Sequence, residues 1–219
     1  MTKADEAYVL LAEMIETGRL EPGAFHTEAG LVEELGLGRT PLREAVQRLD
    51  RDHLVRIRPG RGIEIPSNSV EEQLRRLEVR RVTEALAVAL ACERATVAEL
   101  AGIQALAEEL EGIQELETYV GVVRGTHRML CAAAHNEYLA DAMTPLQGLS
   151  RRFWMAHILD GAREVTAGKE LHLQLLRAIL ARDVEAAREA SIQLNDYLVQ
   201  FALGVATRNA RLGSAGFAR

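Results

Sequence analysis

Cysteine, lysine and long apolar runs are all scarce in this sequence, and each scarcity excludes a class of protein. Two cysteines among 219 residues, Cys92 and Cys131, are too few for a disulfide scaffold and match no metal-binding spacing, so we expect free thiols. No apolar run reaches the roughly 18 residues of a membrane span, and the opening residues MTKADEAY lack the apolar core of a signal peptide. The sequence therefore predicts a globular cytoplasmic protein with no membrane partner.

Charge is unevenly distributed along the chain. The formal net charge is −6 at pH 7, and the only lysines are Lys3 and Lys169. Residues 1–38 carry eight acids against two basic residues, whereas residues 39–61 carry seven arginines against three acids. A local positive patch within an acidic protein is typical of a surface that binds nucleic acid. We therefore expect a DNA contact within residues 39–61.

Three helices are expected before residue 52. Residues 4–18 place apolar side chains on one helical face, and residues 27–36 form a short helix with Thr27 as its N-cap. The third helix is expected within the segment GRTPLREAVQRL. There, Thr40 before Pro41 resembles an N-cap followed by proline at the first helical position.

The apolar pattern changes to a period of two after His53. The segments LVRIR and IEI alternate in polarity and flank a PGRG turn, which predicts a short β-hairpin. Gly60 and Gly62 supply the backbone freedom for the turn, and Arg61 projects from its tip. Three helices followed by a hairpin is the order of a winged helix-turn-helix.

The third helix is expected to enter the major groove of duplex DNA with its N-terminal end foremost. Its apolar residues share one face, which leaves Arg39, Arg43 and Arg48 off that face. Arg39 and Arg43 are one turn apart, and guanidinium groups pair with phosphates or with the O6/N7 edge of guanine. We predict that these three arginines bind DNA, and that Arg61 reaches the adjacent groove or backbone.

The chain is expected to be mainly α and to contain two domains. Residues 1–66 form the N-terminal winged helix-turn-helix, and residues 67–69 form a linker. Residues 70–207 form an all-α bundle of six to seven helices, and residues 208–219 form a frayed tail.

Several helix starts can be located within the predicted bundle. Thr96 followed by Glu99 three residues later fits a capping box. Asn136 and Asp183 are expected to cap two further helices. About six helices result, which is enough for a bundle with an internal cavity.

The segments GRTPLREAVQRL and LVRIRPGRG resemble the DNA-binding motif of GntR-type bacterial transcription regulators, and EMIETGRLEPGAF resembles the family's first helix and turn. The resemblance implies five DNA-contacting residues: Arg39, Thr40, Arg43, Arg61 and Gly62. Gly38 stands where the family usually has serine or threonine, and Ala29 stands where arginine can occur. His53 replaces the usual glycine after the recognition helix, and histidine tolerates left-handed backbone better than most residues.

The helical remainder resembles the all-helical ligand-binding domain of the fatty-acid-regulator-like (FCD) subfamily. The matching segments are LEVRRVTEALA at 77–87, HRMLCAAAHNEYL at 127–139 and LHLQLLRAILARDVEAAREA at 171–190. The resemblance implies a domain that binds a small-molecule effector.

In many members of this subfamily, one aspartate and three histidines hold a divalent metal. His127 and His172 match two of these ligands, but Val123 and Leu194 stand at the positions of the aspartate and the third histidine. Two imidazoles alone would bind a metal weakly. We expect no tightly bound cofactor or metal. A weak divalent site at His127 and His172 stays open, as does a plain hydrogen-bonded role in the core.

The effector is expected to be a small organic acid, bound through its carboxylate in a mostly apolar cavity. In this interpretation His127 and His172 orient the ligand, and Arg80 or Arg152 is the partner of its charge. A neighbouring anion favours protonated histidine, so binding should tighten toward acid pH.

The function that fits these features is a ligand-responsive, homodimeric repressor of transcription rather than an enzyme. A two-fold pair of winged helices would bind a palindromic operator in double-stranded DNA. One alternative is a DNA-binding regulator whose sensing site has decayed, as Val123 and Leu194 suggest. The other is a helical-bundle metalloenzyme supported only by His127 and His172, since no Glu-x-x-His motif, phosphate loop or nucleophile elbow appears.

Overall fold

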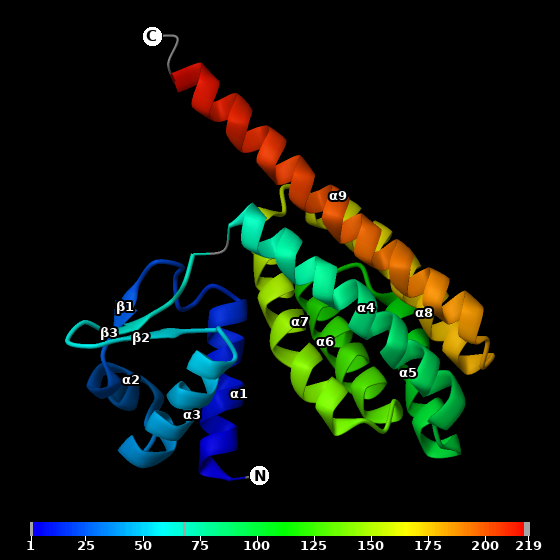
Figure 1. Ribbon diagram of the computed structural model, residues 1–219, viewed down its shortest axis with the longest axis horizontal. Coiled ribbons are helices and arrows are strands. Elements are labelled where there is room, and N and C mark those ends of the chain that lie inside the picture. The colour runs from blue at the N-terminus through cyan, green and yellow to red at the C-terminus, as the bar shows by residue number, and fades with distance from the viewer. Residues whose placement is uncertain (1, 68, 217–219) are drawn as a thin grey trace. The chain divides into compact units, whose positions relative to one another are not determined.

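The computed structural model describes residues 2–67 and 69–216, which form nine α-helices and three short strands (Figure 1). In chain order the elements are α1 (Lys3–Glu16), β1 (Phe25–His26), α2 (Glu28–Leu35), α3 (Arg39–Arg51), β2 (Arg56–Arg58), β3 (Gly62–Glu64), α4 (Val70–Arg94), α5 (Val97–Gly112), α6 (Leu116–Ala133), α7 (Glu137–His157), α8 (Gly161–Leu180) and α9 (Val184–Gly216). Two compact units result: the N-terminal unit (residues 1–69 with 148–156) and the helical unit (residues 70–147 with 157–219).

The N-terminal unit has the predicted winged helix-turn-helix fold. Apolar residues of α3 recur at spacings of three and four, so that one stripe of the helix faces inward and packs against α1. The core takes buried side chains from all three helices and from β3, among them Leu11, Ile15, Leu31, Leu42, Val46, Leu49 and Ile63. Full burial of each larger aliphatic side chain stabilises the fold by about 1.5–3 kcal/mol.

The wing is a three-stranded antiparallel sheet in the order β1-β3-β2. The predicted hairpin is present, with Ile57 of β2 opposite Ile63 of β3. Sequence analysis missed β1, whose residues Phe25 and His26 pair with Glu64 and Ile63. Two residues are too short a strand to show alternation.

Helix α3 begins earlier than the sequence predicted. Its N-cap is Gly38 and its first residue is Arg39, so the expectation that Thr40 caps the helix was wrong. Pro41 is the third helical residue, where a missing N–H removes no intrahelical hydrogen bond. After the helix, His53 has φ of +61°, which confirms the left-handed geometry expected for it.

The helical unit contains six helices within the described part of the chain, α4 to α9. Helix α4 packs along α9, α8 packs on α9, and α5 packs against α6 and α8. The predicted caps are confirmed. Thr96 and Glu99 form a capping box, Asn136 accepts from the Leu139 N–H at 3.1 Å, and Asp183 accepts from the Ala186 N–H at 3.0 Å.

Helix α9 is longer than the sequence indicated. It continues to Gly216, where a frayed tail was expected from residue 208, because Ala, Arg and Leu at 210–212 are good helix formers. Residues 217–219 of the expected tail lie outside the described residues. Neither α9 nor another helix in the described ranges combines the length and apolar composition needed to cross a membrane.

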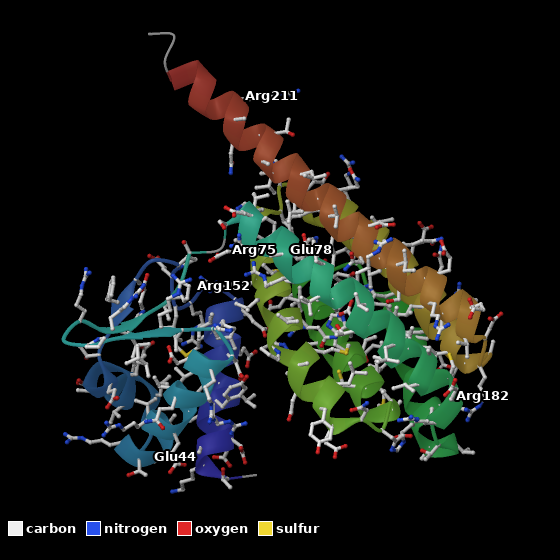
Figure 2. The ribbon with its side chains drawn as sticks, viewed as in Figure 1. Glu44, Arg75, Glu78, Arg152, Arg182 and Arg211 are labelled. Carbon is white, nitrogen blue, oxygen red and sulfur yellow. The ribbon has the colours of Figure 1, made fainter. Side chains whose placement is uncertain are left out.

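Arg182 connects the turn between α8 and α9 to the end of α4 (Figure 2). Its guanidinium donates to the carbonyls of Cys92 and Ala95 at 2.7 and 2.6 Å. The last carbonyls of a helix have no partner within that helix, so Arg182 satisfies groups that would otherwise need water. The Arg182 backbone adopts the left-handed conformation, with φ of +55°.

Asp5 gives the N-terminal unit a pH-dependent contribution to stability. The Thr2 backbone N–H donates to its carboxylate, and with Arg48 and the Thr2 hydroxyl this lowers the pKa of Asp5 from 3.8 to about 2. A lowered pKa stabilises the fold fully above the unfolded value and loses that effect as pH falls through the folded value.

We therefore expect Asp5→Asn to lower the Tm between pH 5 and 7, with a deficit that shrinks as pH falls from about 4 to about 2. The measurement is the Tm of both proteins across this range, with Glu6→Gln as an exposed control on the same helix. A deficit that stays constant to pH 2 would contradict the assignment.

Candidate DNA interface and candidate effector site

The N-terminal end of α3 presents the predicted contact residues to solvent. Arg39, Thr40 and Arg43 are all exposed, and the Arg43 side chain is 69% exposed. The nearest ion-pair partner of Arg43 is Glu28 on α2, at 4.0 Å. Unpaired N–H groups at a helix start favour anions, so this end of α3 can hold phosphate through both backbone and side chains.

The wing places Arg61 at its tip and explains both neighbouring glycines. The Arg61 guanidinium lies 4.7 Å from the centre of the Phe25 ring, and both residues are exposed. Gly60 and Gly62 have φ of +72° and +100°. A Cβ at Gly62 would lie 2.4 Å from the His26 carbonyl oxygen, so the backbone itself requires glycine there. A direct DNA contact by Gly62 stays a prediction.

Arg48 is engaged within the N-terminal unit. Its guanidinium donates to Asp5 at 2.7 Å and lies 4.6 Å from the centre of the Tyr8 ring. Tyr8 in turn donates to Asp52 at 2.5 Å, and burial with that hydrogen bond raises the pKa of Tyr8. These contacts join α1 to α3 and favour a structural role, while DNA binding by Arg48 stays a prediction.

Two of the three acids within residues 39–61 accept hydrogen bonds from groups other than Arg39 and Arg43. Asp50 accepts from the Ile57 N–H at 2.9 Å, and Asp52 accepts from Tyr8. Glu44 is the exposed acid among them and is labelled on α3 in Figure 2. The acids near the start of α3 are therefore the exposed Glu44 and Glu28, which lies 4.0 Å from Arg43.

We expect Arg43→Ala to weaken binding to operator DNA by about 5- to 150-fold at fixed salt, as the loss of a base contact does. The measurement is a gel-shift titration, and Arg39→Ala/Arg43→Ala should weaken binding further.

The control is Arg51→Ala, an equal charge change at the exposed last residue of α3, which should have a much smaller effect. An equal loss of DNA affinity in Arg43→Ala and Arg51→Ala would show that only the overall charge of the helix matters.

A buried ion pair occupies the interior of the helical unit. The Nε and Nη2 atoms of Arg80 donate to Glu84 Oε1 at 3.1 and 2.9 Å, and the Gln147 amide donates to the same oxygen at 3.1 Å. All three residues are buried. Arg80 was predicted as the partner of an anionic effector, and the structure shows that Glu84 already neutralises its charge.

The two predicted histidines come together in the same unit. The rings of His127 and His172 have centroids 5.9 Å apart, and the Tyr119 ring stands edge-on to His172 at 6.0 Å. Tyr119 Oη lies 3.2 Å from His172 Nδ1, and the Gly168 carbonyl oxygen lies 2.7 Å from the same nitrogen. Both histidines are buried.

Burial lowers the pKa of His172. The Gly168 carbonyl and the charge of Glu84 act in the opposite sense, and the charge of Arg80 adds to the lowering. Burial thus favours the neutral imidazole, while the protonated form expected beside an anionic effector stays a prediction.

Arg152, the other predicted anion partner, is grouped with the N-terminal unit. Its Nη2 donates to the Pro66 carbonyl, and the side chain is buried. The structure thus does not group Arg152 with the two histidines. Its contact with an effector stays a prediction.

The side chains around the histidines do not fit a resident divalent metal. Val123 and Leu194 are buried and offer no lone pair where an aspartate and a third histidine were expected. Within the described residues, no three His, Cys, Asp or Glu side chains gather in a way that could hold a metal ion. Two imidazoles leave the charge of such an ion uncompensated.

Sequence analysis missed Glu84, Tyr119, Gly168 and Gln147. Glu84 follows Arg80 by four residues, a spacing that places both on one helix face and was a usable signal. Gly168 precedes His172 by the same interval. Tyr119 and Gln147 reach the cluster only through tertiary packing, which no local pattern reveals.

Gly168 is required by the close approach of Tyr119. A Cβ at position 168 would lie 2.1 Å from Tyr119 Oη. We expect Gly168→Ala to destabilise the protein by about 1–3 kcal/mol, because the overpacking outweighs the better helix propensity of alanine.

Tyr119→Phe should recover much of that loss when combined with Gly168→Ala, as chemical denaturation can measure. The control is Gly121→Ala on α6, where a Cβ meets nothing within 4 Å, and it should be neutral or stabilising. Additive effects of the Gly168 and Tyr119 changes would contradict the clash.

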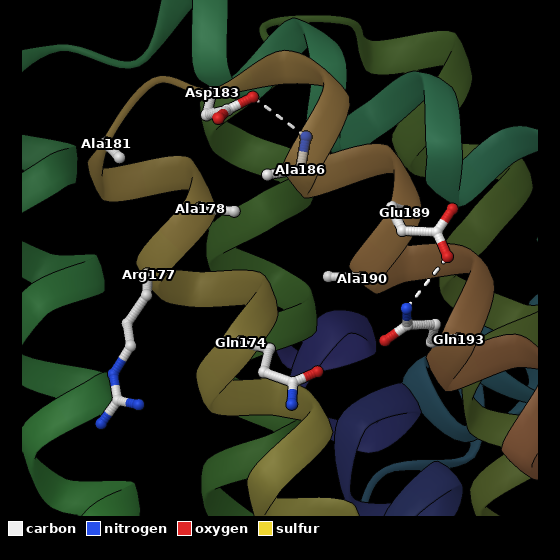
Figure 3. Close-up of a pocket in the computed structure, with 9 residues that line it drawn as sticks. All are labelled: Gln174, Arg177, Ala178, Ala181, Asp183, Ala186, Glu189, Ala190 and Gln193. Atoms are coloured by element: carbon white, nitrogen blue, oxygen red, sulfur yellow. Dashed lines mark hydrogen bonds between the residues drawn. The ribbon is translucent and has the colours of Figure 1, made fainter.

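A separate surface groove of about 490 Å³ lies between α8 and α9 (Figure 3). Its charged groups already have partners. Glu189 accepts from Gln193 at 2.9 Å, Asp183 caps α9, and Arg177 pairs with Glu111 at 2.7 Å. The predicted effector residues lie elsewhere, so this groove is a weaker candidate than the histidine cluster.

Comparison with known proteins matches both units. The family model "Bacterial regulatory proteins, gntR family" matches residues 3–65, and the model "FCD domain" matches residues 75–196. The HTH-type transcriptional regulator McbR of Escherichia coli is 26% identical over 189 residues, which is 84% of this chain and 85% of that protein. The galactonate operon transcriptional repressor of the same bacterium is 26% identical over 219 residues, with 89% and 94% covered.

Solved structures agree on the fold. The structure titled E. coli McbR/YncC aligns with a TM-score of 0.80 at 23% identity, covering 93% of this chain and 98% of that one.

Proposed function

Because the chain belongs to the gntR family of bacterial regulatory proteins and contains an FCD domain, we propose that it is a ligand-responsive repressor released from operator DNA by a small organic acid. Its family and relatives are DNA-binding transcription regulators rather than enzymes. We propose that the protein acts in the cytoplasm, where it would bind operator DNA. The observation that carries the DNA-binding part of the proposal is the exposed start of α3 at Arg39 and Arg43.

Repression and an acidic effector are supported by the names of relatives. Two of them are called the galactonate operon transcriptional repressor and the HTH-type transcriptional repressor GlaR. Galactonate is a hydroxylated organic acid. An acid of this kind could contact Arg80, His127 and His172 in the helical unit.

The test of the proposal is a gel-shift assay on the promoter of the regulator's own gene, with organic acids added at millimolar concentration. We expect sequence-specific binding that one class of acid abolishes. A protein that binds promoter and random DNA equally would refute the proposal. Specific binding that no acid alters would favour the decayed sensing site suggested by Val123 and Leu194.

We also propose that the protein works as a homodimer. One winged helix makes few base contacts, and a two-fold pair doubles them on a palindromic site. The helical unit has an apolar stripe suited to self-association. Val79, Val82 and Leu86 lie on α4 at spacings of three and four and are 48%, 70% and 46% exposed.

Light scattering at micromolar concentration should give twice the chain mass of 24.1 kDa. Val82→Asp should shift the mass toward that of a monomer, because it buries a charge in the interface. Val97→Asp, at an 84% exposed position on α5, is the matched control. A monomer mass for the unaltered protein, with or without operator DNA, would contradict the dimer.

A further inference from the structure

Arg61, at the tip of the wing, contacts an aromatic ring rather than a carboxylate. Arg58 pairs with Glu64 at 2.5 Å, whereas the Arg61 side chain makes no ion pair and no hydrogen bond within the described residues. Its guanidinium instead lies over the Phe25 ring, 4.7 Å from the ring centre. The contact is favourable because the face of the ring is negative and the guanidinium is positive.

Strand β1 fixes the position of this ring beside the wing tip. The Ile65 N–H donates to the Ala24 carbonyl at 2.9 Å, directly before Phe25 in the chain. Gly62 lets β1 approach β3 closely, because a Cβ there would collide with the His26 carbonyl. The short strand that the sequence did not reveal therefore brings Phe25 to Arg61.

The Phe25 ring does not belong to the core of the N-terminal unit. Phe25 lies opposite Glu64, one position along from Ile63, and successive residues of a strand project from opposite faces of the sheet. Ile63 packs into the core, whereas Phe25 is 43% exposed. The contact that the structure gives this ring is the one with Arg61.

Arg48 shows the same contact with a different outcome. Its guanidinium lies over the Tyr8 ring at 4.6 Å, but it also pairs with Asp5 at 2.7 Å, so its charge is neutralised within the unit. Arg61 has the ring without the acid. Its charge is therefore available to an external anion.

A guanidinium that contacts a ring keeps its N–H groups available. The five N–H donors of arginine lie in the plane of the guanidinium, and none of those of Arg61 donates to an acceptor in the described part of the chain. The ring also limits the rotamers that this long side chain samples. Binding then costs less conformational entropy than it would for an unrestrained arginine.

We propose that Phe25 is a positioning residue for DNA binding, whose ring holds the Arg61 guanidinium in place so that its N–H donors contact duplex DNA. Phe25 acts through Arg61 and makes no base contact of its own. This inference rests on the proposed function, because it requires operator binding by the winged helix-turn-helix.

The experiment is a double-mutant cycle on the full-length protein, measured by gel shift with the promoter duplex of the regulator's own gene. Phe25→Leu should weaken binding by about two- to tenfold, which is the cost of ordering one long side chain. In the Arg61→Ala background the same change should have no effect, because the group that Phe25 positions is absent. Phe25→Trp retains an aromatic face and should keep the affinity of the unaltered protein.

The matched control is Ile57→Leu, at a 44% exposed position of the wing that lies opposite Ile63. It should leave the DNA affinity unchanged, and the Tm of every variant reports whether the fold is intact. Proton NMR of the free protein tests the contact without DNA. The Phe25 ring current should shift the δ-protons of Arg61 upfield, and Phe25→Leu should remove that shift.

An equal loss of affinity from Phe25→Leu in both backgrounds would show that Phe25 acts on DNA directly or through the fold, and would overturn the inference. The absence of any loss, or of the ring-current shift, would also overturn it, while specific binding by the unaltered protein would leave the proposed function standing. If the unaltered protein binds the promoter no better than random DNA, the proposed function fails and the inference fails with it.

Discussion

The interior of the helical unit is governed by the need to balance a buried guanidinium. Arg80 is 2% exposed, and an unpaired charge at such a position is strongly destabilising. Glu84, one helical turn away, supplies the counter-charge, and Gln147 fills part of the remaining hydrogen-bonding capacity of the carboxylate. The result is a polar cluster with no net charge. Any acid that enters must compete with Glu84 for Arg80.

The same balance affects the groups around the pair. Burial together with the charge of Glu84 raises the pKa of Cys131 to about 11, so this thiol stays protonated and unreactive at neutral pH. Burial likewise favours neutral His172. The charged groups of the cluster are therefore Arg80 and Glu84, which pair with each other, while the Cys131 thiol and the His172 imidazole are favoured in their uncharged forms.

Much of the fold could be predicted because the relevant signals are local. Caps such as Thr96 and Asp183 act within three residues, and the two periods of apolar residues separate α3 from the wing. The start of α3 was misplaced because Gly38 has no side chain to mark a cap. The site could be only partly predicted. His127 and His172 could be found as residue types, but Tyr119 lies 53 residues from its partner His172, and Gln147 lies 63 residues from its partner Glu84.

In the N-terminal unit, composition was a good guide to function but a poor guide to individual roles. The sequence predicted DNA binding for Arg48 as well as for Arg39 and Arg43, because all three lie off the apolar face of α3. Only the structure shows that Arg48 meets Asp5 and Tyr8 of α1. The distance along the chain, 43 residues to Asp5, hides such a contact from any local pattern.

Arg182 has a consequence for the order of folding. Its left-handed backbone would suit glycine, but glycine could not reach the carbonyls of Cys92 and Ala95. These partners lie 90 and 87 residues earlier in the chain, so the contact closes a long loop and gains nothing until α4 is in place. The turn between α8 and α9 should therefore settle late in folding, after the helices that it joins have formed.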